Sequence, residues 1–385
     1  YPTNNGSKLR IYNLLRGLAQ THQITLLAFA EQSNTDLVPQ LMSICKEVRT
    51  VPWREFDPDS LKARFGLLSR MPRSVIDTYS LEMEQQIEQV LEDEDYDLII
   101  ASQWSMAGYS SCFRGIPALF EEVEVGLHYQ FYTQAKTFQQ RLRYGLSWTK
   151  HKNYIARLLQ DFSACTVVST EEKKLLNKIS PHFNPIEIIP NCIFLDDYQT
   201  DTTEAKPNTL IFTGPFSYHA NYEAMVWFLG KVYPLILAQV PDVELTITGD
   251  SLGKPLPEID NVNLVGFVDD IQSLITSSWI SIVPLQIGGG TRLKILEAMA
   301  LHTPVVSTTK GAEGLDCKPG ENILIADEPI DFANAILTLL KTPNLRNSLV
   351  ENAYQLVSEN YNWSNVMPRF LDLVEMTAKR QSSCN

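Results

Sequence analysis

A glycine-rich segment in the C-terminal half of the chain contains the residues best suited to binding or converting a ligand. A strand-like apolar run ends at Pro284, and Gly288, Gly289 and Gly290 follow it closely. Because glycine has no Cβ, the backbone here can pass close to a ligand. Thr291 then fits the N-cap of a helix, whose free N–H groups and positive dipole end attract an anion. The segment therefore predicts a phosphate site.

Three charged residues follow on the same predicted helix. Arg292 and Lys294 would add positive charge beside a phosphate, and a guanidinium can hold two phosphate oxygens at once. Glu297 lies farther along, where a carboxylate can accept hydrogen bonds from sugar hydroxyls. Glycine-rich turns are common, so the segment alone also fits a capped turn with Arg292 and Lys294 on the surface.

Along the whole chain, strand-like apolar runs alternate with segments of helical spacing, and these elements hold the glycine-rich segment in place. Apolar runs predict strands at residues 24–29, 98–101, 118–120, 165–169, 186–189, 209–213, 243–248, 262–265, 279–283 and 304–307. Helical spacing of apolar residues occurs between them, at residues 8–20, 81–94, 153–160, 221–239, 269–276 and 291–301. This alternation is typical of βαβ units and a mainly parallel sheet, so the fold class is α/β.

A polar stretch at residues 198–208 has hardly an apolar side chain to bury and divides the chain. We interpret it as a linker between an N-terminal domain, 1–197, and a second domain, 209–362, followed by a C-terminal helix in 363–385. Each half predicts a doubly wound, Rossmann-like sheet, and ligands of such sheets bind beyond the carboxyl ends of the strands. The expected site is a cleft between the domains. The chain opens on a loop-like sequence at Tyr1, which suggests that a first strand lies upstream.

The composition excludes several classes of protein. A formal charge of −13 argues against a duplex nucleic-acid binder, because such proteins neutralise phosphates with Lys and Arg. The six cysteines have neither zinc-site spacing nor a disulfide framework, which favours a reducing compartment. No apolar run reaches the roughly 20 residues of a membrane-spanning helix. We therefore expect a cytoplasmic protein.

The segment 288–300, Gly-Gly-Gly-Thr-Arg-Leu-Lys-Ile-Leu-Glu-Ala-Met-Ala, resembles the donor-site signature of the retaining GT-B glycosyltransferases of group 1 (family 4) type. Further segments that resemble this family occur in the family's order: 189–192, 212–224, 245–250, 265–270, 303–308 and 311–315. The resemblance covers the C-terminal half and, more loosely, the N-terminal half. It implies the GT-B fold, with two Rossmann-like domains facing a cleft and a last helix that packs back on the first domain.

The resemblance also implies roles for individual residues. Glu297 would bind the ribose of a nucleotide-sugar donor, and the backbone at Phe267 and Val268 would hold its base. Residues 289–291 would contact the diphosphate through backbone and hydroxyl. A glycine loop around Gly6 would face the diphosphate from the N-terminal domain, although Asn-Gly-Ser is also ordinary loop chemistry.

The chain departs from the family pattern in its donor site. The first of the two glutamates in the usual motif falls on Gly289, which leaves the contacts to the donor sugar undefined. The Arg and Lys usual near the start of the second domain are absent, and Phe216 and Ser217 stand where the Arg would be. Arg292 and Lys294 are the candidate catalytic substitutes, offsetting charge on the departing diphosphate.

Glu121 stands where the family often has a histidine after a strand of the N-terminal domain. As a candidate catalytic residue, its carboxylate would orient a sugar hydroxyl or act as a base. A solvated acidic loop explains the run Phe120-Glu-Glu-Val-Glu124 equally well, because charge runs usually face water. His128 and His219 are more simply explained as structural, and we assign them no role.

The sequence predicts neither a metal nor a cofactor. No group of His, Asp and Glu has the spacing of metal ligands, and no Asp-x-Asp follows a strand. A helix dipole together with Arg292 and Lys294 can manage a diphosphate without a cation.

The stretch 139–159 combines five Lys and Arg residues with large apolar ones in an otherwise acidic protein. Such a stretch suggests peripheral contact with an anionic membrane. A core helix with a solvated basic face is the alternative, and general experience favours it. The resemblance favours the membrane, because many relatives glycosylate lipid-linked acceptors.

Together these features predict transfer of a sugar from a nucleoside diphosphate, with UDP favoured over GDP, to a hydroxyl acceptor. Retention of configuration, and an acceptor in polysaccharide or glycolipid synthesis, come from the resemblance alone. Two alternatives stay open: a GT-B nucleotide-sugar epimerase and a non-catalytic GT-B subunit that binds nucleotide. The missing glutamate and the substituted basic residues favour the second alternative.

Overall fold

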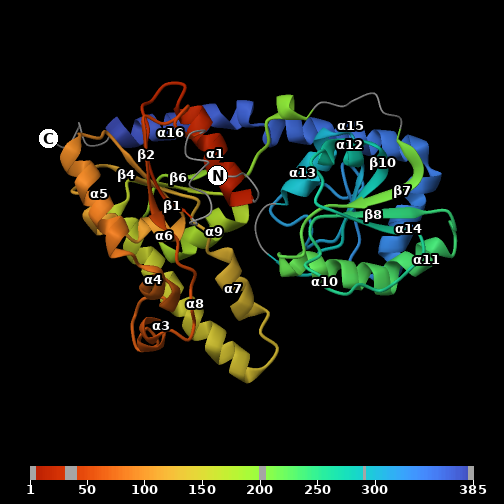
Figure 1. Cartoon of the computed structure of the whole chain (residues 1–385), viewed down its shortest axis with the longest axis horizontal. Helices are drawn as coiled ribbons and strands as arrows, with labels where there is room; N and C mark the ends of the chain where they lie inside the picture. The colour runs from red at the N-terminus through yellow and green to blue at the C-terminus, as the bar shows by residue number, and fades with distance from the viewer. Residues whose placement is uncertain (1–5, 31–40, 199–204, 289–291, 380–385) are drawn as a thin grey trace. The chain divides into compact units, whose positions relative to one another are not determined.

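The computed structural model describes residues 6–30, 41–198, 205–288 and 292–379. The chain folds into two compact units (Figure 1). Unit 1 comprises residues 1–190 and 367–385, and unit 2 comprises residues 191–366. Among the described residues, none of the helices has the length and apolar character needed to cross a membrane.

Unit 1 is built on parallel strands. β1 (Thr25–Ala30) pairs with β2 (Glu47–Pro52), and a second sheet has the order β3-β4-β5-β6. The four strands of this sheet are β3 (Ile99–Ser102), β4 (Ala118–Glu121), β5 (Ala164–Val167) and β6 (Ile186–Ile188). β4 and β5 are buried along their whole length, as expected for central parallel strands.

The helices of unit 1 surround these strands. They are α1 (Gly6–Leu18), α3 (Leu61–Phe65), α4 (Arg73–Thr78), α5 (Leu81–Asp93), α6 (Gln103–Ala107), α7 (Gly126–Thr133), α8 (Phe138–Leu158) and α9 (Thr170–Ile179). α8 begins at a capping box, in which Thr137 and Gln140 each accept a hydrogen bond from the other's backbone N–H. Its last turns pack into the core through Tyr154, Ile155 and Leu158.

Unit 2 has one six-stranded sheet, whose paired strands are all parallel, in the order β12-β11-β10-β7-β8-β9. Its strands are β7 (Lys206–Phe212), β8 (Glu244–Thr248), β9 (Val262–Gly266), β10 (Ser278–Val283), β11 (Val305–Ser307) and β12 (Leu324–Ile325). Its helices are α10 (His219–Trp227), α11 (Tyr233–Leu237), α12 (Ile271–Thr276), α13 (Leu293–Ala300), α14 (Pro329–Lys341) and α15 (Pro343–Asn360). Figure 1 shows α12 and α13 on one side of the sheet and α10 and α11 on the other. This is the doubly wound arrangement that the sequence predicts.

The predicted elements are present with shifted ends, whereas β2, β12, α14 and α15 are among those that the sequence does not predict. β7 starts at Lys206, three residues earlier than predicted and inside the stretch interpreted as a linker. The helix after the glycine-rich segment starts at Leu293, and Arg292 takes the N-cap position that the sequence assigned to Thr291. α16 (Trp363–Lys379) closes the chain, and its residues from Met367 onward belong to unit 1.

Candidate functional site

Lys294 lies at the carboxyl end of β7 in unit 2. From the first turn of α13, its Nζ donates to the carbonyl oxygen of Thr213 and, at 3.0 Å, to Oδ1 of Asn221. The same ammonium lies 4.4 Å from the centre of the Phe212 ring. The side chain is half-buried. A surface lysine, the simpler alternative left open by the sequence, is therefore excluded.

Gly214 makes this arrangement possible. Its φ of +129° is a conformation that side chains rarely adopt. A Cβ at this position would lie 2.7 Å from Nδ2 of Asn221 and 2.9 Å from Nζ of Lys294. Asn221 also donates to the carbonyl oxygen of Pro215 at 2.8 Å, so the turn after β7 wraps closely around both side chains.

Burial lowers the pKa of Lys294 to about 7. The neighbouring positive charge of Arg292 lowers the pKa further, while Glu297 raises it. Near neutral pH the ammonium is thus only partly protonated, since the free energy of solvation lost by burial favours the neutral amine. An anion that approached Nζ would restore the charged form.

Glu297 lies one turn along α13 from Lys294. Burial raises the pKa of its carboxyl group, and the hydrogen bond from Tyr198 and the charge of Lys294 lower it. The phenol of Tyr198 donates to Oε1 of Glu297 at 3.2 Å. The sequence analysis missed Tyr198, because it stands 99 residues from Glu297 in a polar stretch that has no motif.

Arg292 is 5% exposed and electrostatically close to Lys294. The predicted diphosphate contacts Gly289, Gly290 and Thr291 lie outside the described residues. Gly288, directly before them, has a φ of +111°, and a Cβ there would lie 2.2 Å from the hydroxyl of Tyr218.

The predicted base-binding residues lie in the loop between β9 and α12. The side chain of Phe267 is 82% exposed, and Val268 is half-buried. Asp270 then caps α12 by accepting a hydrogen bond from the backbone N–H of Ser273 at 3.0 Å. The loop thus presents an exposed aromatic ring, whereas Lys294 and Glu297 are hydrogen-bonded to neighbouring groups.

In unit 1, Glu121 is part of a buried ion pair at the end of β4. It is 1% exposed, and its Oε1 lies 2.7 Å from both Nε and Nη2 of Arg10. Ser102, its neighbour on β3, donates to Oε2 at 2.8 Å, and Thr166 donates to Oε1 at 3.4 Å. The alternative of a solvated acidic loop is therefore wrong for Glu121.

Glu122, the next residue, is the less constrained carboxylate. Burial and the charge of Glu121 raise its pKa to about 7. Its Oε2 accepts a hydrogen bond from Nε2 of Gln103 at 2.8 Å. Both Gln103 and Glu122 have positive φ, at +61° and +58°, which is uncommon for residues other than glycine. Sequence reasoning chose Glu121 and passed over this neighbour.

Gly6, His128 and His219 complete the set of residues that the sequence analysis considers. Gly6 is the first residue of α1. His128 stacks on His151 with ring centres 3.7 Å apart, and burial lowers its pKa to about 4. In unit 2, His219 is exposed and lies 3.5 Å from Glu223 on α10.

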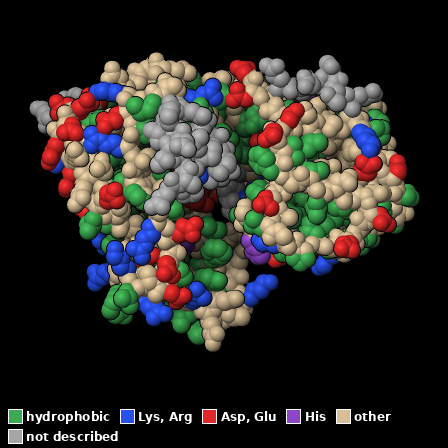
Figure 2. Space-filling view, in the orientation of Figure 1, with side chains coloured by type: hydrophobic (Ala, Val, Ile, Leu, Met, Phe, Trp, Pro, Cys, Tyr) green, Lys and Arg blue, Asp and Glu red, His purple; other side chains and the backbone are tan. Residues whose placement is uncertain are grey.

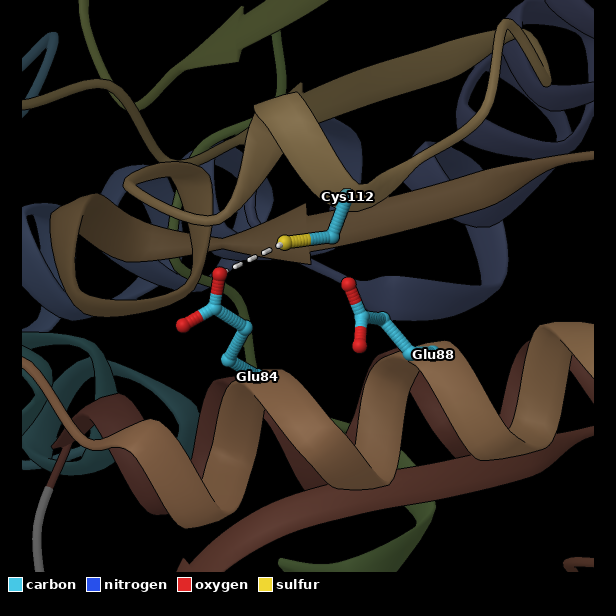
Figure 3. Close-up of side chains that lie close together, drawn as sticks. All are labelled: Glu84, Glu88 and Cys112. Carbon is cyan, nitrogen blue, oxygen red and sulfur yellow. Dashed lines mark hydrogen bonds between the residues drawn. The ribbon is translucent and has the colours of Figure 1, made fainter.

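Among the described residues, one group has side-chain ligand atoms close enough together to hold a metal ion: Glu84, Glu88 and Cys112 (Figure 3). Glu84 and Glu88 lie one turn apart on α5, and the thiol of Cys112 points toward Glu84, its donor sulfur 3.9 Å from Oε1. Burial raises the pKa of Cys112 and so disfavours the thiolate that a metal needs. These residues combine a protonated thiol with hard carboxylates, a donor set poorly suited to any one metal.

The chain is similar in sequence to one protein family and to two individual proteins. Residues 207–342 match the family model described as "Glycosyl transferases group 1". A Klebsiella pneumoniae protein described as an "uncharacterized 44.6 kDa protein in cps region" is 23% identical over 376 residues, 94% of each chain. A Xenopus tropicalis protein, "glycosyltransferase 1 domain-containing protein 1", is 28% identical over 148 residues, which cover 34% of this chain and 43% of that protein.

Solved structures with a similar fold are glycosyltransferases of the GT-B kind. Anabaena HepE in complex with UDP-glucose has a TM-score of 0.69 at 15% identity, covering 98% of this chain and 97% of its own. Sucrose-phosphate synthase from Thermosynechococcus elongatus has a TM-score of 0.66 at 17% identity, covering 97% and 93%. The fold is GT-B, as predicted, and the part of the chain that matches the glycosyl transferases group 1 model lies within unit 2.

Proposed function

We propose that this protein is a retaining glycosyltransferase that moves a sugar from a nucleoside diphosphate to a hydroxyl acceptor. The observation that carries the proposal is the position of Lys294, whose ammonium lies at the carboxyl end of β7, one helical turn from Glu297. Ligands of doubly wound sheets bind at this edge, and a partly desolvated cation there suits a diphosphate.

Lys294 can also replace the basic residues that this chain lacks near the start of its second domain. The resemblance leads one to expect basic residues just after the first strand of the second domain, where this chain has Phe216 and Ser217. Phe216 is buried in the core of unit 2 and has no charge to offer a phosphate. Lys294 reaches the same strand end from α13 and brings a positive charge to the carbonyl of Thr213. We infer that a different element supplies the missing charge.

The proposed roles of the residues follow from their chemistry. Glu297 accepts hydrogen bonds from the ribose, the loop at Phe267 and Val268 holds the base, and residues 289–291 with the start of α13 hold the diphosphate. When the bond between the sugar and the diphosphate breaks, Lys294 and Arg292 offset the negative charge that builds on the leaving group. The acceptor oxygen bonds to the sugar carbon, and its proton passes to the departing diphosphate.

Three finer points belong to the same proposal. UDP is the expected donor nucleotide, supported by the neighbour HepE, which was solved with UDP, with UDP-glucose, and with UDP and glucose. The reaction needs no metal, because the start of α13, Arg292 and Lys294 supply positive charge. The acceptor belongs to a surface polysaccharide or glycolipid made at the cytoplasmic face of a membrane, which the relative from a cps region supports.

A non-catalytic subunit that binds nucleotide is the second candidate. One observation favours it: Glu121, which stands at the family's histidine position, is held in a buried ion pair with Arg10 and is not open to a substrate. Such a subunit would bind the nucleotide through Glu297 and Lys294 but would not break the bond to the sugar.

Thermal shift with nucleotides tests the donor site. In EDTA, UDP should raise the Tm of the wild-type protein, since a ligand at 100 times its Kd stabilises by about 2.7 kcal/mol. Glu297→Gln keeps the shape of the side chain and should fold normally, but its response to UDP should fall. The matched control is Glu313→Gln, an exposed residue paired with Lys310, and its response should be unchanged. If Glu297→Gln responds like wild type, or if UDP acts only with Mg²⁺, the proposed donor site is wrong.

A further inference from the structure

An apolar ridge on α8 is exposed in unit 1. Phe138, Leu142 and Leu146 are 82%, 58% and 60% exposed and recur every four residues, so they form one row along the helix. α7 covers a neighbouring face of α8, where Phe131 stacks on Tyr144 and the ring of Tyr129 lies against Trp148. The exposed row thus lies beside a packed face and has no cover among the described residues.

The row continues onto a second segment of the chain. Its next member, Lys150, donates through Nζ to the carbonyl oxygens of Gly66 at 3.2 Å and Leu67 at 2.8 Å. These residues form the turn that ends α3, so the row on α8 leads directly to this turn. The exposed apolar side chains there are Leu61, Phe65, Leu67 and Leu68, between 59% and 92% exposed. We call the seven residues Leu61, Phe65, Leu67, Leu68, Phe138, Leu142 and Leu146 the α3–α8 patch.

The patch does not belong to the core. Farther along the same row, Tyr154 is 5% exposed and packs into the core of unit 1. The helix therefore turns its row from solvent into the core between Leu146 and Tyr154. The C-terminal half of α8 is therefore part of the core, as one of the two sequence-based alternatives predicts, while its N-terminal half exposes the apolar row.

The surroundings of the patch are basic. Residues 125–160 contain six Lys and Arg and no Asp or Glu, in a chain with 45 acidic and 32 basic residues. Lys62, Arg64, Arg70 and Arg73 follow on the α3 side, where Arg64 lies 3.6 Å from Asp59. Figure 2 shows Lys and Arg side chains, with hydrophobic side chains and some Asp and Glu among them, over the part of unit 1 where Figure 1 places α3, α4 and α8.

We propose that the α3–α8 patch docks unit 1 on an anionic lipid surface. Exposed apolar side chains on a short helix and its turn can enter the boundary between headgroups and acyl chains, while Lys and Arg around them meet anionic headgroups. Binding to lipid does not depend on the proposed function. Its purpose does, because docking would bring the enzyme to an acceptor at the membrane.

Vesicle flotation tests the docking. The full chain should float with vesicles of phosphatidylglycerol and phosphatidylcholine in equal parts, and bind vesicles of phosphatidylcholine alone at least tenfold more weakly. The variants Leu142→Ser/Leu146→Ser and Phe65→Ser/Leu68→Ser should each lose binding at least tenfold. In Arg141→Gln/Arg143→Gln the loss should be about fivefold for each charge removed.

Matched variants far from the patch serve as controls. Leu235→Ser/Ile330→Ser changes exposed apolar residues of unit 2, and Lys231→Gln/Lys341→Gln removes two exposed charges there; both should bind vesicles like wild type. Every variant should keep its Tm and its response to UDP, so a failure of docking can be told from a failure of the donor site. Unchanged binding by the patch variants, equal loss in the controls, or a wild-type dimer that the patch variants dissociate would overturn the proposal.

Discussion

At the level of single residues, the proposed donor site rests on two ionisable side chains of α13 and on the neighbours that hold them. Lys294 is held by the carbonyl of Thr213 and by Asn221, and Glu297 by Tyr198. Burial shifts both groups toward their neutral forms, lowering the pKa of Lys294 and raising that of Glu297. A nucleoside diphosphate would reverse one of these shifts, since its negative charge favours the ammonium.

Binding of UDP should therefore take up a proton at Lys294. In the free protein its pKa is about 7, and the diphosphate raises it, so at pH 8 binding converts neutral amine to ammonium. Affinity for UDP should then fall as the pH rises from 7 to 9. Calorimetry in buffers of different ionisation enthalpy measures the proton uptake directly. Lys294→Met, which cannot take up a proton, is the control, and equal uptake in both proteins would contradict this assignment.

Tyr198 should act on the nucleotide through Glu297. Its hydrogen bond lowers the pKa of Glu297, so Tyr198→Phe should raise that pKa and protonate the carboxylate at a higher pH. Binding of UDP, measured from pH 5 to 8, should fail at a higher pH in Tyr198→Phe than in wild type. The two proteins should converge at pH 8. Tyr222→Phe, which loses a hydrogen bond to the carbonyl of Pro255 instead, should follow the wild-type curve.

At the scale of elements, the ends of parallel strands position the reactive side chains in each unit. In unit 2 the turn after β7 wraps Lys294, and in unit 1 the adjacent ends of β3 and β4 bring Ser102 to Glu121 and Gln103 to Glu122. Gln103 and Glu122 both keep an uncommon backbone conformation there. Strain of this kind is frequent near functional sites, so the end of β4 is a candidate for acceptor contacts.

Gly214→Ala tests how closely the turn after β7 must fit. The new Cβ would meet both Asn221 and Lys294 at less than 3 Å, so the response of the Tm to UDP should be largely lost. Gly253→Ala is the matched control, because Gly253 also has a positive φ but a Cβ there meets nothing within 4 Å. Both variants should lose some stability from their backbone strain, roughly 1 kcal/mol or more. Only Gly214→Ala should lose the response to UDP.

The sequence predicts most of the elements, because buried parallel strands read as apolar runs. It misses β2, whose Glu47-Val-Arg-Thr-Val-Pro52 alternates charged and apolar residues at the edge of a two-stranded sheet. It also misses the contacts that hold the site, since Lys294 stands 73 residues from Asn221 and Glu297 stands 99 residues from Tyr198. Motif spacing reports local geometry, whereas these contacts arise from strand order in the sheet. To choose Glu122 over Glu121 would have needed the position of Arg10, which pairs with Glu121 and which no local pattern supplies.

At the level of the whole molecule, the chain combines a GT-B fold with a proposed donor site in unit 2 and an exposed apolar patch on unit 1. The fold alone does not decide between a transferase and a subunit that only binds nucleotide. The two differ in one property, which is the ability to break the bond between the sugar and the diphosphate. A transferase without its acceptor commonly transfers its sugar slowly to water.

Release of UDP from a UDP-sugar, in EDTA and without acceptor, distinguishes a transferase from a subunit that only binds nucleotide. UDP-glucose, UDP-galactose and UDP-N-acetylglucosamine are offered in turn to the wild-type chain and to Lys294→Met, and free UDP is measured over time. We predict slow release that saturates with one of these donors. In Lys294→Met the maximal rate should fall by a factor of about 100–1000, the usual cost of one group that stabilises the departing charge. A protein whose Tm rises with UDP but which releases none from any UDP-sugar would contradict the account, and it would be a nucleotide-binding subunit instead.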